Sequence, residues 1–131
     1  MSRALILMYH LVDTPRSAKE HRFCTPPDEF IRQMDHLVGS YSPIGLDELV
    51  AGVRGSRPLP ERAVHVTFDD GFANNLTAAL PILESLCVPA TLFLATAFLD
   101  SPKPFPNDNW PGAGSAGIPD VAWRPLTTDE A

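Results

Sequence analysis

The chain has 131 residues, with 10 basic and 16 acidic side chains and a formal net charge of −6. This length fits a single domain, and a hydrophobic fraction of 44% with a charged fraction of 20% excludes a disordered tail or a fibrous repeat. The acidic balance and the absence of any basic run argue against a nucleic-acid partner. Proline is enriched, with 14 residues, about twice its average share.

No stretch of the sequence has the pattern of a secretory signal or a membrane span. The apolar run at residues 4–9 is too short for a signal core, and no small-residue cleavage site follows it. The longest apolar stretch, residues 90–99, is far below membrane-spanning length. We therefore expect a cytoplasmic protein without a membrane span. Cys24 and Cys87 are expected to be free thiols of a reducing compartment, with a single disulfide as the alternative.

Strand-like and helix-like patterns alternate along the chain. Short apolar runs predict strands buried on both faces at residues 3–9, 63–68 and 90–94, and a shorter strand at 41–44. Apolar residues at helical spacing predict helices after residue 28, over 46–53 and over 76–86. This alternation indicates parallel βαβ units and an α/β fold.

Prolines bear on two of these helices. The sequence Thr25-Pro26-Pro27-Asp28 has the pattern of a capping box with proline in the first turn. Pro81 lies inside the third helical pattern, so that helix is either kinked or begins late.

The character of the sequence changes at residue 100. Residues 100–131 are rich in proline and glycine, which predicts an irregular segment, although they still carry Trp110 and Trp123. Near the end, Thr127 and Glu130 have the spacing of a helix N-cap and its reciprocal partner. Because a domain rarely ends where a helix begins, this pattern predicts that the chain is the front part of a longer one.

The strongest chemical feature is a pair of adjacent carboxylates, Asp69 and Asp70, followed by Gly71. They come at the end of a buried strand, and ligands bind at that end of the strands in parallel α/β folds. Two adjacent ionised carboxylates repel each other unless a cation or a shared proton relieves them. The pattern favours a site in which one carboxylate binds a metal and the other takes protons. The alternative is an ordinary Asp-Gly turn with solvated acids.

A histidine follows the first strand. If the strands at residues 3–9 and 63–68 are parallel, His10 emerges at the same edge of the sheet as Asp69 and Asp70. It is then either a site histidine or simply the residue that ends a strand. By contrast, His65 lies within a buried strand and is expected to be a hydrogen-bonded core residue.

Together these features resemble the polysaccharide deacetylase family, carbohydrate esterase family four. The matching motifs are, in chain order, Ile6-Leu7-Met8-Tyr9-His10, Phe30-Ile31-Arg32-Gln33-Met34, Pro43-Ile44-Gly45-Leu46-Asp47-Glu48-Leu49, Thr67-Phe68-Asp69-Asp70-Gly71, Leu80-Pro81-Ile82-Leu83 and Val88-Pro89-Ala90-Thr91-Leu92-Phe93. They extend over most of the chain, from about residue 4 to residue 99, and imply a single domain of this type over residues 1–131.

The resemblance implies the N-terminal part of a distorted (β/α) barrel and a divalent metal, usually zinc. By position, Asp70 corresponds to the metal ligand, Asp69 to the general base and His10 to a histidine of the substrate pocket. The implied reaction removes acetyl groups, mainly N-acetyl, from an N-acetylated oligo- or polysaccharide.

The sequence departs from the family pattern in one respect. The two metal histidines of the family lie in an H-x-x-x-H motif, which this sequence does not contain. The prediction is therefore an incomplete zinc site, a chain inactive alone, and a C-terminal half encoded downstream. The alternatives are a non-catalytic glycan-binding or interaction remnant of the same fold, in which Trp110 and Trp123 could stack on sugars, and a degraded reading frame without a stable product.

Overall fold

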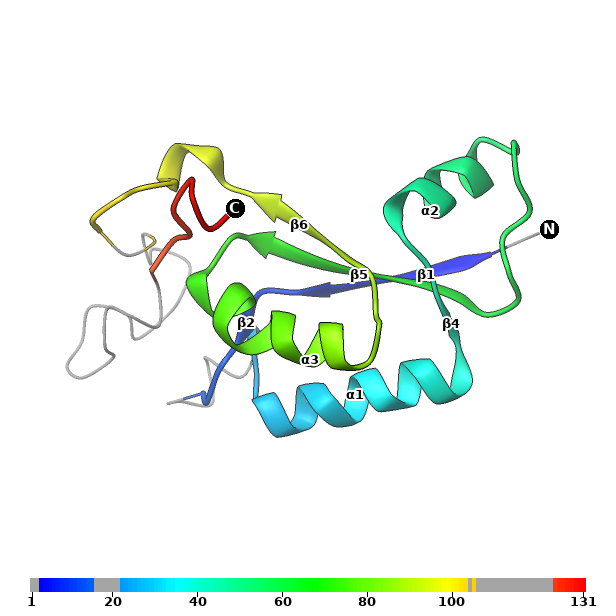
Figure 1. Ribbon diagram of the computed structural model, residues 1–131, viewed down its shortest axis with the longest axis horizontal. Coiled ribbons are helices and arrows are strands. Elements are labelled where there is room, and N and C mark those ends of the chain that lie inside the picture. The colour runs from blue at the N-terminus through cyan, green and yellow to red at the C-terminus, as the bar shows by residue number, and fades with distance from the viewer. Residues whose placement is uncertain (1–2, 16–21, 104, 106–123) are drawn as a thin grey trace.

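A computed structural model describes residues 3–15, 22–103, 105 and 124–131 (Figure 1). Its centre is a parallel sheet made of β1 (Ala4–Tyr9), β4 (Ser42–Pro43), β5 (Ala63–Asp70) and β6 (Ala90–Leu94). The arrowheads of β1, β5 and β6 point the same way in Figure 1, so their carboxyl ends lie at one edge. The predicted α/β arrangement is confirmed.

Strand β5 is the centre of the sheet. Strand β1 runs along one side of it, in a register that begins with Ala4 opposite Ala63 and ends with Tyr9 opposite Phe68. On the other side, β4 pairs with the first residues of β5, and β6 pairs with its last five. Two strands therefore share one edge of β5, one after the other.

A second, smaller sheet continues from β1. It joins β2 (Leu11–Val12) to β3 (Cys24–Thr25) in parallel. The Leu11 N–H donates to the Phe23 carbonyl at 3.0 Å, and the Asp13 N–H donates to the Thr25 carbonyl at 3.1 Å. The chain after β1 is thus held on one side by backbone hydrogen bonds.

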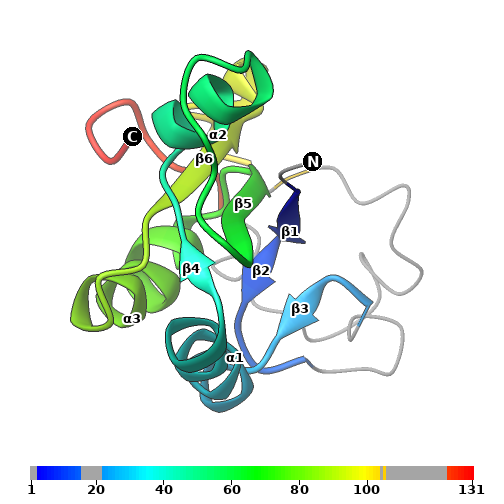
Figure 2. The same ribbon diagram turned by 90° about the vertical axis from the view of Figure 1, so that its right-hand side faces the viewer.

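Two helices, α1 (Pro27–Ser40) and α3 (Leu80–Ser85), cover one face of the sheet (Figure 2). Side chains alternate between the faces of a strand, and Val64, Val66 and Phe68 of β5 point to this side. They form the main core with buried residues of the helical layer: Phe30, Met34, Leu37, Ala79 and Leu83. A third helix, α2 (Leu46–Val53), packs through Leu49 on Ile44 and Ala63.

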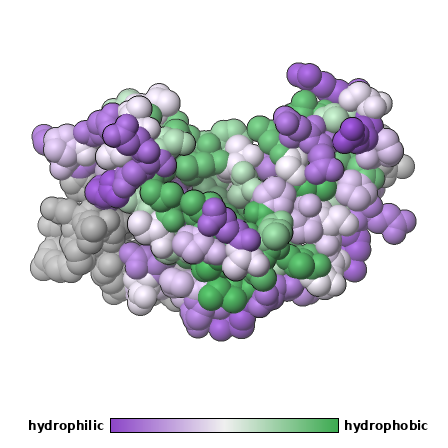
Figure 3. All heavy atoms as spheres, in the orientation of Figure 1, coloured by the Kyte–Doolittle hydropathy of each residue, from purple (hydrophilic) through white to green (hydrophobic). Residues whose placement is uncertain are grey.

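The opposite face of the sheet is covered less completely among the described residues. The side chains that share it include Ile6, Met8 and Phe93, which are 60%, 62% and 53% exposed. On another side of the molecule, the one with α3 and β6 toward the viewer, Figure 3 shows hydrophobic side chains that also reach the surface, between the polar surfaces of α2 and of the C-terminal segment. No helix among the described residues is long and apolar enough to cross a membrane.

Proline affects two helices in different ways. Helix α1 starts with Pro27 after Pro26 and has no side-chain cap, so the predicted capping box with Thr25 does not form. Helix α3 has Pro81 in its first turn but continues a helical run that starts at residue 73, so the helix is irregular near the proline and does not begin late. The preceding residues form the π-helix η2 (Asn75–Ala79), in which the Leu80 N–H bonds to the Asn75 carbonyl.

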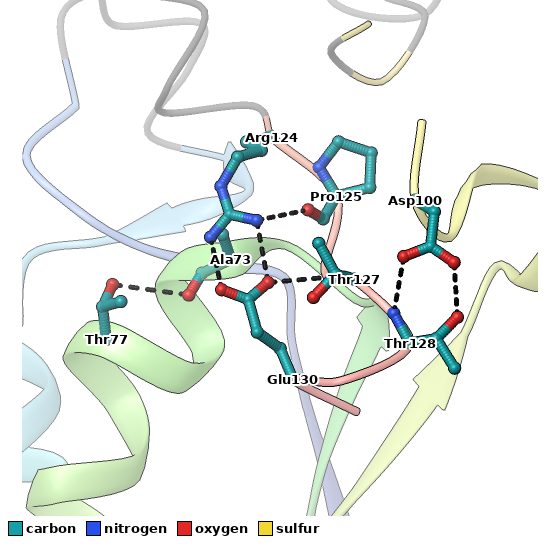
Figure 4. Close-up of polar contacts among 8 residues, drawn as sticks. All are labelled: Ala73, Thr77, Asp100, Arg124, Pro125, Thr127, Thr128 and Glu130. Carbon is teal, nitrogen blue, oxygen red and sulfur yellow. Dashed lines mark hydrogen bonds and ion pairs between the residues drawn. The ribbon is translucent and has the colours of Figure 1, made fainter. Parts of the chain in front are cut away.

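The C-terminal segment, residues 124–131, returns to the end of β5. The Ala73 N–H donates to the Arg124 carbonyl at 2.8 Å, and the Leu126 N–H donates to the Gly71 carbonyl at 2.9 Å. The Arg124 guanidinium binds both carboxylate oxygens of Glu130 at 2.8 Å (Figure 4). Glu130 also accepts the Thr127 N–H at 2.9 Å, which is the reciprocal contact that the sequence predicts. Trp110 and Trp123 lie outside the described residues.

Candidate active site

His10 and the two adjacent aspartates lie at the same edge of the sheet. Tyr9 pairs with Phe68, so His10 leaves β1 beside Asp69 and Asp70. The His10 Nε2 atom is 4.0 Å from the Asp70 Oδ2 atom, and the two side chains are 17% and 42% exposed. The parallel pairing that the sequence predicts therefore brings all three candidate residues to one edge.

Asp70 is held in an unusual backbone conformation. Its φ is 74°, and the Gly71 N–H donates to the Asp69 carbonyl at 3.0 Å, which makes Asp70 the central residue of a γ-turn. A non-glycine residue with positive φ is strained by roughly 1–3 kcal/mol and persists only where its surroundings fix it. Here the Asp70 carbonyl accepts the Ala95 N–H at 3.0 Å. Strain of this kind gathers at functional sites, so it supports a functional reading of Asp70.

Gly71 completes the turn. Its φ is 88°, and a Cβ atom there would lie 2.7 Å from the Leu94 Cδ2 atom. Only glycine fits this conformation and this approach without strain. The Gly71 carbonyl accepts the Leu126 N–H, so the C-terminal segment reinforces the turn that aims Asp70.

His10 lies between an aromatic ring and a small hollow. The Phe23 ring meets the His10 ring edge to face, with centroids 5.6 Å apart. Beside His10 is a cavity of about 220 Å³, whose lining includes Tyr9, Arg22 and Gln33. The Tyr9 hydroxyl donates to Gln33 Oε1 at 2.7 Å. Burial, with a smaller effect of Glu29, raises the pKa of Tyr9 to about 12, so the phenol stays protonated at neutral pH.

Two asparagines that the sequence analysis did not single out form hydrogen bonds to the backbone at His10 and Val12. Asn75 Nδ2 donates to the His10 carbonyl at 2.6 Å, and Asn74 Oδ1 accepts the Val12 N–H at 3.4 Å. Asn75 is 6% exposed, and its Oδ1 atom accepts no hydrogen bond within the described part of the chain. Nothing in the sequence distinguishes these residues from ordinary loop or cap asparagines.

The donors present fit part of a zinc shell. The Asp70 carboxylate is an oxygen ligand of the type that zinc accepts in catalytic sites. The residues that the structure describes contain no group of three His, Cys, Asp or Glu side chains able to hold a metal ion. Asp70 could therefore serve as one ligand, but these residues do not complete a zinc shell.

His65 has a structural role, as predicted. It is 1% exposed, and its ring contacts the Ile44 carbonyl through Nδ1 at 2.8 Å and Thr91 Oγ1 through Nε2 at 3.0 Å. Because a carbonyl only accepts, Nδ1 carries the proton. His65 therefore bonds to residues beside β4 and within β6, at the place where β5 changes its neighbour. Cys24 is buried and Cys87 is exposed, and no disulfide joins them.

Comparison with known proteins identifies the family. The sequence profile described as Polysaccharide deacetylase matches residues 56–118. The poly-beta-1,6-N-acetyl-D-glucosamine N-deacetylase of Escherichia coli (strain K12) is 37% identical over 62 residues, which are 47% of this chain and 9% of that protein. YxkH of Bacillus subtilis (strain 168) is 30% identical over 90 residues, which are 68% of this chain and 30% of YxkH. The chain belongs to the polysaccharide deacetylase family.

The solved structures agree with this assignment. A de-N-acetylase from Aggregatibacter actinomycetemcomitans superposes with a TM-score of 0.72 and 25% identity, covering 97% of this chain and 48% of that one. Such family members have a (β/α) barrel, and the parallel sheet with its covering helices corresponds to part of that barrel. The chain thus spans less than half the length of each of these relatives.

Proposed function

We propose that this chain supplies the catalytic carboxylates of a metal-dependent carbohydrate deacetylase that acts mainly on N-acetyl groups. The observation that carries the proposal is the meeting of Asp69, Asp70 and His10 at one sheet edge, in a member of the polysaccharide deacetylase family. The relative from Escherichia coli is a deacetylase of poly-beta-1,6-N-acetyl-D-glucosamine, which supports an N-acetylated oligo- or polysaccharide as the substrate class.

The two carboxylates have different tasks. The residues are adjacent, but Asp70 alone has a positive φ, at the centre of the γ-turn. Asp70 would hold the metal, and Asp69 is the general base that takes a proton from the attacking water. A divalent ion, expected from the family pattern to be zinc, would supply the positive charge that polarises the acetyl carbonyl. Water attacks the carbonyl carbon, the C–N bond breaks, acetate leaves and the sugar amine gains a proton.

His10 borders the substrate pocket. This assignment is supported by two observations: the His10 Nε2 atom is 4.0 Å from Asp70, and His10 lines the 220 Å³ cavity beside Tyr9 and Gln33. The remaining metal ligands come from a segment outside this sequence. This part of the proposal is supported by the incomplete donor set of the described residues, and it makes the chain inactive alone.

The same incomplete donor set supports a second candidate function. A fold that keeps the Asp69–Asp70 turn without a full metal shell would be a non-catalytic glycan-binding or interaction remnant. Such a protein would bind sugar without metal.

The test begins with sequencing the gene and transcript beyond the codon of Ala131. The complete reading frame is then expressed and assayed for amine release from β-1,6-linked N-acetylglucosamine oligomers with added zinc. We expect Asp69→Asn to lower kcat by about 100-fold or more. Asp70→Asn should lose stoichiometric zinc binding, while Asp35→Asn, an exposed change on α1, should alter neither property.

Three results would decide against the proposal. Full turnover of the Asp69→Asn protein would remove the assigned base. Tight zinc binding and turnover by the 131-residue chain alone would remove the need for outside ligands. Saturable sugar binding without metal, with no turnover by the complete frame, would establish the remnant instead.

A further inference from the structure

The ladder between β1 and β5 stops just before the site. Its last pair is Tyr9 with Phe68, although β5 itself continues to Asp70, where it pairs with β6 alone. The chain that follows β1 nevertheless stays extended through Val12. Peptide groups two residues apart in an extended chain face the same side. Leu11 and Asp13 therefore face β3, whereas His10 and Val12 face the side that β5 has left.

Asn74 and Asn75 occupy that side. The Asn75 side chain donates one hydrogen bond, to the His10 carbonyl at 2.6 Å. The Asn74 side chain accepts one, from the Val12 N–H at 3.4 Å. One donor and one acceptor, offered to residues two apart, are what a neighbouring strand would offer through its own backbone.

Asn74 lies in the helical segment that leads into η2. Its φ of −71° and ψ of −13° are helical, so it is not an N-cap, whose backbone is typically extended. Its side-chain oxygen accepts a hydrogen bond from the Val12 N–H, 62 positions away in sequence.

Asn75 gives up part of its own hydrogen bonding to make this contact. It is 6% exposed, and its Oδ1 atom has no partner among the described residues. A buried acceptor without a partner is unfavourable, so general stability does not explain an asparagine here. The donated bond to His10 is the contact that only its amide nitrogen provides.

We propose that Asn74 and Asn75 act as a substitute strand, and that Asn75 is the positioning residue that sets His10 against Asp70. Both asparagines follow the Asp69–Gly71 turn by only a few residues, so one short segment carries the carboxylates and the support for the histidine. The positioning of the His10 ring by Asn75 can be tested whatever the protein catalyses, whereas its effect on turnover rests on the proposed function.

Two aspartate substitutions provide a matched test, since both are isosteric and both add one negative charge. Asn75→Asp removes the N–H donor, whereas Asn74→Asp keeps an acceptor oxygen. Hydrogen exchange of the Leu11 and Val12 amides should become roughly tenfold faster in Asn75→Asp and stay near wild type in Asn74→Asp. At one fixed pH, the His10 ring resonances should broaden or split in Asn75→Asp, while those of His65 stay in place.

The same variants are assayed in the complete reading frame. Asn75→Asp should lower kcat at least tenfold with little change in KM, because it displaces His10 without removing any group that contacts the substrate. If the wild type shows no turnover, the proposed function is wrong, and the exchange and ring measurements still decide the positioning role.

Several outcomes would overturn the proposal. One is a folded Asn75→Asp protein with unchanged Leu11 and Val12 exchange and an unchanged His10 ring. Another is equal disturbance by the Asn74→Asp control. If Asn75→Asp does not fold, Asn74→Ala decides, because loss of its acceptor should speed Val12 exchange about fivefold while the amide of Val66 keeps its protection. Unchanged Val12 exchange in that variant would contradict the substitute strand.

Discussion

The two ends of β5 are built differently. At its beginning, His65 is 1% exposed, and both ring nitrogens have hydrogen-bond partners. At its end, the Asp70 side chain is 42% exposed, and its backbone is strained at a φ of 74°. At the first end the hydrogen-bonding groups of the buried histidine ring are all paired, whereas at the second end a carboxylate is held by a strained backbone. Stability and chemistry are thus separated along one strand of eight residues.

The largest expected effect is at the stable end. His65→Leu removes the donor to the buried Ile44 carbonyl and the acceptor for the Thr91 hydroxyl. Leaving such buried groups unpaired should lower the free energy of unfolding by about 2–4 kcal/mol, measured by urea denaturation. The control His36→Leu changes an exposed histidine of α1 and should stay within about 0.5 kcal/mol of wild type. Equal effects at both positions would contradict the structural role of His65.

A smaller effect of opposite sign is expected at the strained end. Asp70→Gly and Asp70→Ala both remove the carboxylate, but only glycine accepts a φ of 74° without strain. The glycine variant should therefore be about 1 kcal/mol more stable to unfolding than the alanine variant. Thermal denaturation of the two proteins side by side measures this difference. An alanine variant as stable as the glycine variant would mean that the turn relaxes and stores no strain.

The smallest effect concerns the segment that supports the strained end. The hydrogen bonds from Arg124, together with that from the Thr127 N–H, lower the pKa of Glu130 to about 2. The ionised form is therefore favoured by folding, and its contribution is full above the ordinary pKa of about 4.5. It should fade as the pH falls from about 4.5 to about 2. Comparing the unfolding of wild type and Glu130→Gln across this range measures it, and a difference that grows at low pH would have the wrong sign.

The general architecture could be predicted from the sequence because it depends on local patterns. Apolar runs located the strands, and parallel pairing then placed His10 beside Asp70, as expected. Pro81 correctly indicated an irregular helix, since proline lacks the N–H that a regular helical turn would use, and a π-helix precedes it. The capping box predicted at Thr25 does not form. The helix starts at Pro27 with Pro26 as its N-cap, so Thr25 lies one residue before the position that a capping side chain would occupy.

Other features depend on contacts that local patterns do not encode. The positive φ of Asp70 is imposed by hydrogen bonds from Ala95 and by the turn at Gly71. Asn75 contacts His10 only because the fold brings together two residues that are 65 positions apart in the sequence. The roles of Asp69, Asp70 and His10 in chemistry remain predictions, to be decided by the variants described above.

The central place of β5 also has a consequence for synthesis. In the described sheet, β1, β4 and β6 each pair with β5, so none of them has a strand partner until β5 exists. Strand β1 is translated roughly 60 residues before β5, and at about 5–20 residues per second it waits several seconds for its partner. During that interval its core-facing side chains, Leu7 and Tyr9, have no sheet to join. The nascent chain should therefore engage ribosome-associated chaperones early, well before Asp69 and Asp70 have been made.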